Sequence, residues 1–119
     1  IDKTPYVMNN HAYFLASDNQ RLQDALKWST LANEMVMDEP NFMDTHALIL
    51  HLLTRNSDAL DWIVKAQTLI NYPDAVFLER EGDIRWSLGE YEKAHKLWEK
   101  AIITGGGKKR LNEKLSRVL

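Results

Sequence analysis

The sequence predicts an all-α fold, an α-α superhelix in which three helix-turn-helix repeats are closed by a C-terminal capping helix. Small residues recur at intervals of about 35 positions, the spacing of a solenoid of stacked helix pairs. Apolar residues follow the three-and-four spacing of helices, and the alternation typical of strands is missing. The small residues form three sets: Ala12, Ala47 and Gly82; Ala25, Ala59 and Ala94; Ala32, Ala66 and Ala101.

Prolines mark the start of the first helix in each repeat. Proline is tolerated in the first turn of a helix, where its missing N–H would have no intrahelical partner. Pro5 follows Thr4, which can cap a helix, and Pro40 and Pro73 repeat this arrangement further along the chain. The first helices are therefore predicted over residues 5–17, 40–54 and 73–88.

Turn-forming residues separate each first helix from its partner. They lie at residues 17–20, 55–57 and 88–90, and the partner helices are predicted over 21–37, 57–70 and 90–103. Gly89 suits the left-handed conformation that commonly ends a helix. The repeats thus extend over about residues 5–39, 40–72 and 73–104 of a single domain, 1–119.

The last segment is predicted to form a capping helix over about residues 107–119. It follows three glycines and places its apolar residues on one face, as an amphipathic helix does. A solenoid needs such a helix to cover its terminal repeat. The apolar residues are Leu111, Leu115, Val118 and Leu119.

Composition excludes several classes of protein. The 119 residues carry 15 basic and 17 acidic side chains, so a net charge of -2 provides no attraction to nucleic acid. The chain has no cysteine and no apolar run long enough for a membrane span, so we expect no thiolate metal site and no membrane insertion. It begins without methionine, and we expect it to be a piece of a longer protein; its compartment stays open.

The third repeat resembles a tetratricopeptide repeat (TPR) over residues 82–101, GDIRWSLGEYEKAHKLWEKA. Residues 47–66 and 12–32 resemble two weaker copies, so the resemblance covers most of the chain. It looks most like the repeat arrays that close many bacterial TPR proteins. In this family the first helices of the repeats line a concave groove that binds peptides.

The resemblance implies a groove that is acidic and aromatic. We expect Asp44, Asp83 and Trp86 to be exposed in one continuous trough. Such a surface suits a protein or peptide segment with a lysine or arginine and an apolar anchor, since opposite charges steer encounter and aromatic residues supply contact energy. The alternative is an ordinary solvated face. The predicted groove residues are Asn9, Tyr13, Asp44, Leu48, His51, Glu79, Asp83 and Trp86.

A second hypothesis is structural. The chain would be the terminal part of a longer solenoid that spaces another domain or forms an oligomer such as a homodimer. This hypothesis predicts an uncovered apolar surface around Tyr6, Val7 and Met8, where preceding helices would pack.

Two histidines bear on catalysis and metal binding. His46 lies one repeat before Glu81. Equivalent positions on packed helices are too far apart to share one ion, so we expect no metal site but a hydrogen bond between the two residues. His51 beside Asp83 is the sole candidate for an acid–base pair, and no catalytic motif is present, so we expect neither an enzyme nor a cofactor.

Two tryptophans occupy corresponding places in the second helices of the first two repeats, Trp28 and Trp62. Aromatic residues at such spacing are usually packed between helices, which is the interpretation that we favour. If both were exposed, they would instead mark a second docking surface or a dimer contact.

Overall fold

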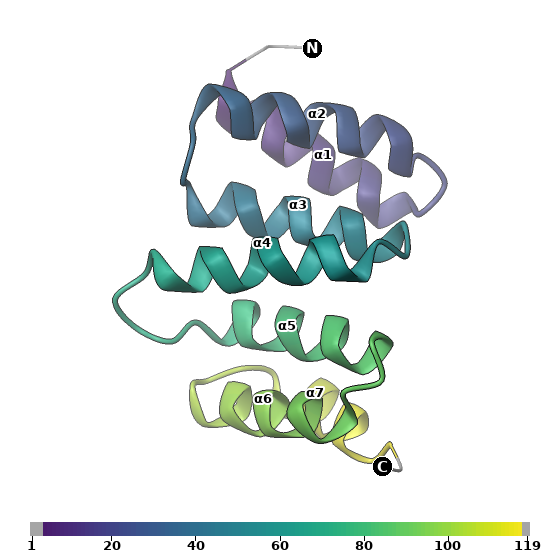
Figure 1. Ribbon diagram of the computed structural model, residues 1–119, viewed down its shortest axis with the longest axis vertical. Helices are drawn as coiled ribbons and strands as arrows, with labels where there is room; N and C mark the ends of the chain where they lie inside the picture. Colours follow the sequence, from purple (N-terminus) through teal and green to yellow (C-terminus); the bar gives the residue numbers. More distant parts are fainter. Residues whose placement is uncertain (1–3, 118–119) are drawn as a thin grey trace.

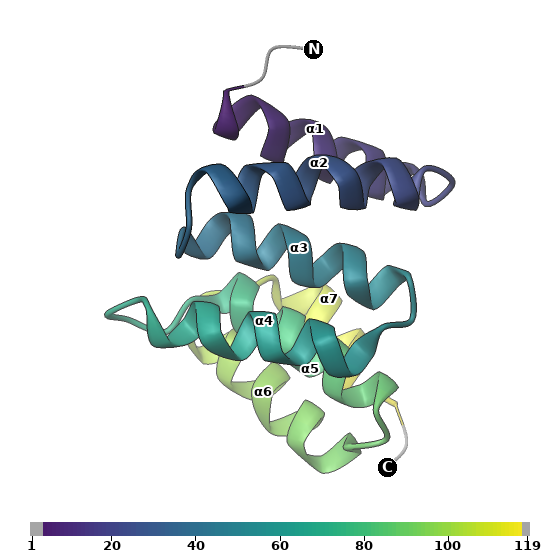
Figure 2. The ribbon, with the colours of Figure 1, turned by 45° about the horizontal axis from the view of Figure 1, so that its top comes forward.

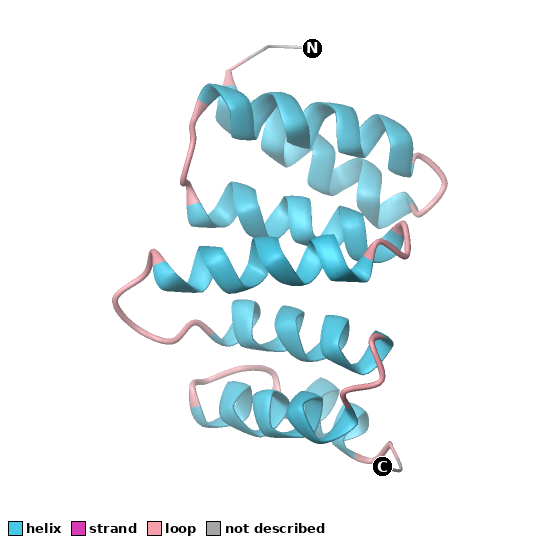
Figure 3. Cartoon of the chain, in the orientation of Figure 1, coloured by secondary structure: helices cyan, strands magenta, loops and turns pink. Residues whose placement is uncertain are grey.

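The structure, a computed structural model, confirms the all-α fold. It describes residues 4–117, which form seven helices and no strand (Figure 3). The predicted apolar positions Val118 and Leu119 lie outside the described residues. No helix within this range is both long and apolar enough to cross a bilayer.

Six of these helices form three hairpins that are stacked along the longest axis of the chain, and the seventh lies beside the last hairpin (Figures 1 and 2). Each helix packs most extensively against its hairpin partner. The hairpins are α1 (Pro5–Asp18) with α2 (Leu22–Met35), α3 (Pro40–Leu52) with α4 (Asn56–Thr68), and α5 (Ala75–Ser87) with α6 (Tyr91–Ile103); the seventh helix is α7 (Lys108–Leu115).

The recurring small residues are buried, as predicted. All eight alanines of the three sets have no exposed surface, and Gly82 is buried as well. Small side chains let the helix axes approach closely and leave shallow holes between the two helices of a hairpin. These holes receive side chains from the next repeat.

Each repeat inserts two apolar side chains into the repeat before it. Phe42 and Ile49 of α3 pack among residues of α1 and α2, and Phe77 and Ile84 of α5 pack among residues of α3 and α4. On the third hairpin, Leu111 of α7 takes this role, and it is fully buried. The core is thus a series of apolar clusters along the stack, and α7 covers the cluster at its C-terminal end.

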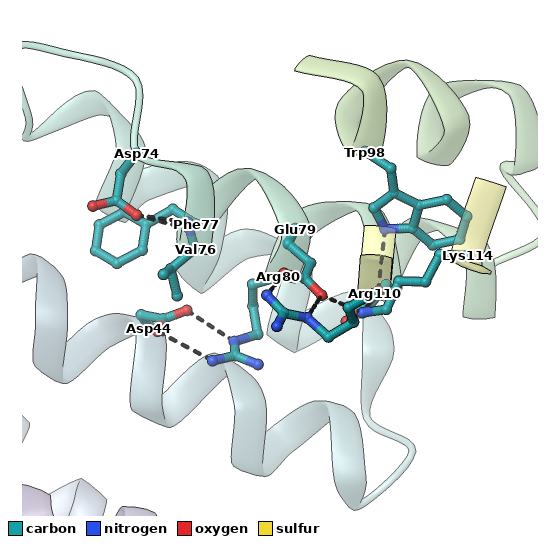
Figure 4. A network of polar contacts seen from close by, with 10 residues as sticks. Asp44, Asp74, Val76, Phe77, Glu79, Arg80, Trp98, Arg110 and Lys114 are labelled. Carbon is teal, nitrogen blue, oxygen red and sulfur yellow. Dashed lines mark hydrogen bonds and ion pairs between the residues drawn. The ribbon is translucent and has the colours of Figure 1, made fainter. Parts of the chain in front are cut away.

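The prolines identify two of the three helix starts correctly. Pro5 and Pro40 are the first residues of α1 and α3. The prediction for Pro73 is wrong, because α5 begins at Ala75. The Asp74 carboxylate accepts hydrogen bonds from the backbone N–H groups of Val76 and Phe77 and caps the helix there (Figure 4).

The three hairpin turns share one backbone device, a residue in the left-handed conformation. Gly89 has a φ of 82°, as predicted, while Asn19 and Thr54 adopt 56° and 62° at the corresponding turns. Glycine takes this conformation without strain, and asparagine tolerates it better than a β-branched residue does. The turn geometry is thus retained even where the sequence lacks glycine.

Candidate functional site

The predicted groove residues lie on α1, α3 and α5, but they do not form a free acidic trough. Tyr13 is half exposed, while Leu48 and His51 are partly covered. The prediction that Asp44 is exposed is wrong, because only 8% of its surface is accessible. Asn9 is also buried, and its Oδ1 has no hydrogen-bond partner within residues 4–117.

Asp44 is buried because it pairs with Arg80 of the next repeat (Figure 4). Nε of Arg80 donates to Oδ1 over 2.9 Å and Nη2 to Oδ2 over 3.4 Å. Burial raises the pKa of Asp44, and the charge of Arg80 offsets this only in part. For Arg80, burial opposes the charge, but the pairing with Asp44 holds its pKa above the usual value. The pair ties α3 to α5.

The two carboxylates of α5 are paired with α7. Arg110 donates to both oxygens of Glu79 over 2.8 and 2.7 Å. Lys114 donates to Glu79 over 2.6 Å and to the two oxygens of Asp83 over 2.8 and 2.9 Å (Figure 4). Hydrogen bonds from Arg110, together with Lys114 and against the effect of burial, lower the pKa of Glu79 to about 2.

Trp86 belongs to an aromatic cluster at the end of α5. Its ring lies 4.5 Å from that of Tyr91 and 5.6 Å from that of Trp98, between centroids. The guanidinium of Arg117 lies over both tryptophan rings, 5.4 Å from Trp86 and 5.2 Å from Trp98. A cation over an indole face at this distance is attracted by the ring electrons. Nε2 of His95, in the same cluster, is buried without a partner in the described part of the chain.

Each predicted groove carboxylate is therefore neutralised by a cation that lies further along the chain. Asp44 is satisfied by α5, and Glu79 and Asp83 by α7. The sequence contains a signal for this arrangement, because Lys114 stands 35 residues after Glu79 and thus in the same phase of the repeat. The prediction that the capping helix is an apolar cover does not include these ion pairs.

The predicted hydrogen bond between His46 and Glu81 is wrong. Nδ1 of His46 lies 2.9 Å from Oγ of Ser29, and its ring packs on Trp62 with centroids 4.4 Å apart. Glu81 instead accepts hydrogen bonds from Gln67 and Arg85. The contacts of His46 thus lie with Ser29 of α2 and Trp62 of α4, and Glu81 has other partners.

Trp28 and Trp62 are partly buried and pack against the apolar clusters of the first two repeats, as the interpretation that we favoured predicts. The rings of Trp28 and His11 form a T-shaped contact, with their centroids 5.7 Å apart. The alternative, a second docking surface made of two exposed indoles, is not supported by this packing.

Acidification is expected to destabilise the fold through His46. Burial and the charge of Arg55 lower its pKa to about 4, whereas an unfolded histidine titrates near 6.5. Between these values the unfolded chain binds the additional proton, so the free energy of unfolding falls as the pH drops from about 6.5 towards 4. By pH 4.5 we expect a loss of about 2 kcal/mol from this group.

Urea denaturation at pH 7 and pH 4.5 measures this loss. His46→Gln keeps a side chain that can accept from Ser29 and cannot titrate, so the variant should lose less stability than the wild type over the same interval. An identical loss in both proteins would show that His46 does not carry the pH dependence.

The sole candidate for an acid–base pair does not form. Nδ1 of His51 lies 2.6 Å from Oδ1 of Asn56, within its own hairpin. Asp83 is engaged by Lys114 and accepts a hydrogen bond from Nε1 of Trp98 over 3.1 Å. Residues 4–117 also contain no group of three or more side chains placed to hold a metal ion.

Helix α1 carries apolar side chains that stay largely exposed among the described residues. Phe14 is 71% exposed, Tyr6 65% and Val7 37%, in agreement with the structural hypothesis. Met8, which that hypothesis includes, is buried instead, because it packs against Phe42 and Ala32. The repeat phase distinguishes the exposed Val7 and Phe14 from the buried Met8. Val7 corresponds to the inserted residues Phe42 and Phe77, and Phe14 corresponds to Ile49 and Ile84.

Comparisons of the chain with protein-family models, with curated proteins and with solved structures found no match. The fold itself defines the class, an all-α array of helical hairpins. Its resemblance to tetratricopeptide repeats rests on the residues of the chain alone.

Proposed function

We propose that the chain is a non-catalytic protein-interaction module, a TPR-like solenoid whose first hairpin docks onto a further helical hairpin. One observation carries this proposal. Val7 and Phe14 occupy the positions that every later repeat uses to insert into its predecessor, yet in α1 they are exposed. An apolar surface of this kind typically marks a site of association.

The partner chemistry follows from the packing between the hairpins of the stack. Ile49 enters a hole lined by Ala12, Ala16 and Ala25, and Ile84 lies beside Ala47 and Ala59. Phe14 would need an equivalent hole. The partner is therefore a helical hairpin with small residues on its contact face, supplied by a longer array of the same kind.

The experiment extends the array by one repeat. A copy of residues 40–74 placed directly before Pro5 continues the repeat phase, because it ends where α5 begins in the native chain. Phe14→Asp should cost less than about 0.5 kcal/mol in the native chain, where the side chain is exposed, and about 3 kcal/mol in the extended array. Urea denaturation measures both values.

Ile103→Asp provides the matched control. This residue is 86% exposed at the end of α6, far along the chain from the added repeat, so its cost should remain small in both proteins. If Phe14→Asp costs the same in the native and extended chains, α1 does not receive a hairpin.

The concave groove remains a second candidate site, for a segment with basic residues and an apolar anchor. The observation in its favour is that Glu79, Asp83 and Trp86 already contact a segment of this chemistry, which comes from the chain's own C-terminal part. Tyr13, at the other end of the groove, is free of this segment.

A further inference from the structure

Helix α5 and the C-terminal segment present matched stripes of side chains. On α5 the stripe is Glu79, Asp83 and Trp86, three residues with i, i+4 and i+7 spacing, which places them on one face of a helix. The opposing stripe has the same spacing: Arg110, Lys114 and Arg117. The three pairs meet in order, as two ion pairs and one cation over an indole ring.

An apolar anchor accompanies the basic stripe. Leu111 follows Arg110 directly, has no exposed surface and packs among Leu78, Trp98 and Ala101. The segment that lies on α5 is thus a basic amphipathic helix with one buried leucine. This is the class of ligand that the acidic and aromatic residues of the groove would select from a partner.

The helix that occupies this site is held weakly by its own local structure. α7 has eight residues, and isolated helices shorter than about 12 residues are marginal in water. Its N-cap, Gly107, offers no side-chain hydrogen bond, and the first turn contains Lys108, Lys109 and Arg110, whose charges oppose the helix dipole. Its helicity therefore depends on docking, and segments of this kind open at the lowest free energy.

The connection to α6 is a short segment rich in glycine. Gly105, with a φ of 105°, and the two glycines that follow separate α6 from α7. Glycine imposes few conformational restrictions, so this linker can adopt other paths when α7 is released.

We propose that the α5 stripe binds a basic amphipathic helix of a partner protein, which takes the place of α7. The partner helix carries lysine or arginine at i, i+4 and i+7 and a leucine at i+1. This inference rests on the groove proposal and is independent of docking at α1. Because a tethered helix competes at a millimolar effective concentration, α7 acts as a built-in competitor that weakens binding of the partner.

The experiment uses the full chain and a defined probe, a fluorescein-labelled peptide with the sequence of residues 107–117. Fluorescence anisotropy measures its binding to the wild type and to the double variant Arg110→Glu, Lys114→Glu, in which α7 is repelled by Glu79 and Asp83. The variant should bind the peptide at least about tenfold more tightly, because the competitor is removed.

The matched control is Lys108→Glu, Lys109→Glu. It makes the same charge change on the same helix, at two exposed residues that form no ion pair within residues 4–117. Acidic residues in the first turn favour the helix, so this control should bind the peptide no more tightly than the wild type does. Circular dichroism checks that each protein is folded. If the charge-reversed variant does not fold, the milder Arg110→Gln, Lys114→Gln replaces it, with the same expected direction.

The outcomes separate this inference from the groove proposal. Tight binding that is equal in the wild type and in both variants would retain a groove for basic segments but overturn the exchange with α7. Failure of the peptide to bind any of the folded variants would overturn both. Sedimentation that shows a dimer of the wild type, lost when Glu79 is changed to Lys, would assign the site to α7 of a second copy and overturn a separate partner.

Discussion

Gly82→Ala is expected to destabilise the chain by about 2 kcal/mol, although alanine is the better helix former. A Cβ at this position would lie 2.5 Å from Nε1 and 2.6 Å from Cδ1 of Trp98. The indole cannot move away easily, because it is fully buried and Nε1 donates to Asp83. Contacts this short place the cost near the upper end of the overpacking range of about 1 to 3 kcal/mol, and the gain in helix propensity of about 1 kcal/mol offsets only part of it.

The same position tolerates alanine one repeat earlier. Ala47 corresponds to Gly82, and Ile63 corresponds to Trp98, so the smaller residue on one helix faces the larger one on its partner. In the first repeat Ala12 is matched with Ser29, and both are fully buried. At this contact between the two helices of a hairpin, the three repeats therefore divide the side-chain volume differently between the two positions.

A second background tests whether the contact itself is responsible. Trp98→Ile leaves a cavity and should by itself lower the free energy of unfolding by about 3 kcal/mol, because truncation of a large buried aromatic side chain has a cost of this order. Within this background, Gly82→Ala should be neutral or stabilising, because it recreates the pair Ala47 and Ile63. Chemical denaturation of the four proteins gives the coupling energy. An equal cost of Gly82→Ala in both backgrounds would exclude the contact with Trp98 as the cause.

The architecture could be predicted from the sequence because, in a helical repeat array, the same contacts between helices recur at a fixed interval. Buried small residues must recur wherever helices approach, so Ala12, Ala47 and Gly82 show the stack directly. Helix starts are less certain, as Pro73 shows. A proline permits a start, whereas the Asp74 side chain, which satisfies two backbone N–H groups, fixes it.

The state of the groove could not be predicted in the same way. The sequence places Asp44, Glu79 and Asp83 on the correct helices. Whether each carboxylate is free depends on how far, and in which direction, basic side chains from other helices extend. Arg80 reaches back to Asp44 instead of pointing to solvent, and Arg110 is brought to Glu79 by the path of the glycine linker. Single-sequence periodicity contains no information on that path.

Removal of Arg80 is expected to have a still larger effect than the substitution at Gly82. Arg80→Met keeps much of the side-chain volume but leaves the buried carboxylate of Asp44 without its cation. Loss of one partner of a buried pair costs about 3 to 5 kcal/mol, because the remaining charge is neither hydrated nor compensated. The side chains of Arg80 and Asp44 are only 16% and 11% exposed, so most of the surface of both is removed from water.

The pH dependence of this cost identifies its origin. Burial already raises the pKa of Asp44 in the folded chain, and without Arg80 the pKa rises further. A carboxyl group whose pKa is higher in the folded state binds more protons there, so folding is favoured as the pH falls through that pKa. The cost of Arg80→Met relative to the wild type should therefore be smaller at pH 5 than at pH 7.

The double variant Asp44→Asn, Arg80→Met removes the charge together with its partner and should regain most of the lost stability. Its difference in stability from the wild type should change less between pH 7 and pH 5 than that of the single variant. An amide of nearly the same shape needs no counter-ion, and its burial costs less than that of an unpaired carboxylate. If the single variant lost the same free energy at both pH values and the double variant were no more stable, the contribution of Arg80 would lie in its packing between α3 and α5. The polar contacts along the inner face would then be a consequence of the stack, and the apolar side chains that each repeat inserts into its predecessor would alone hold the hairpins together.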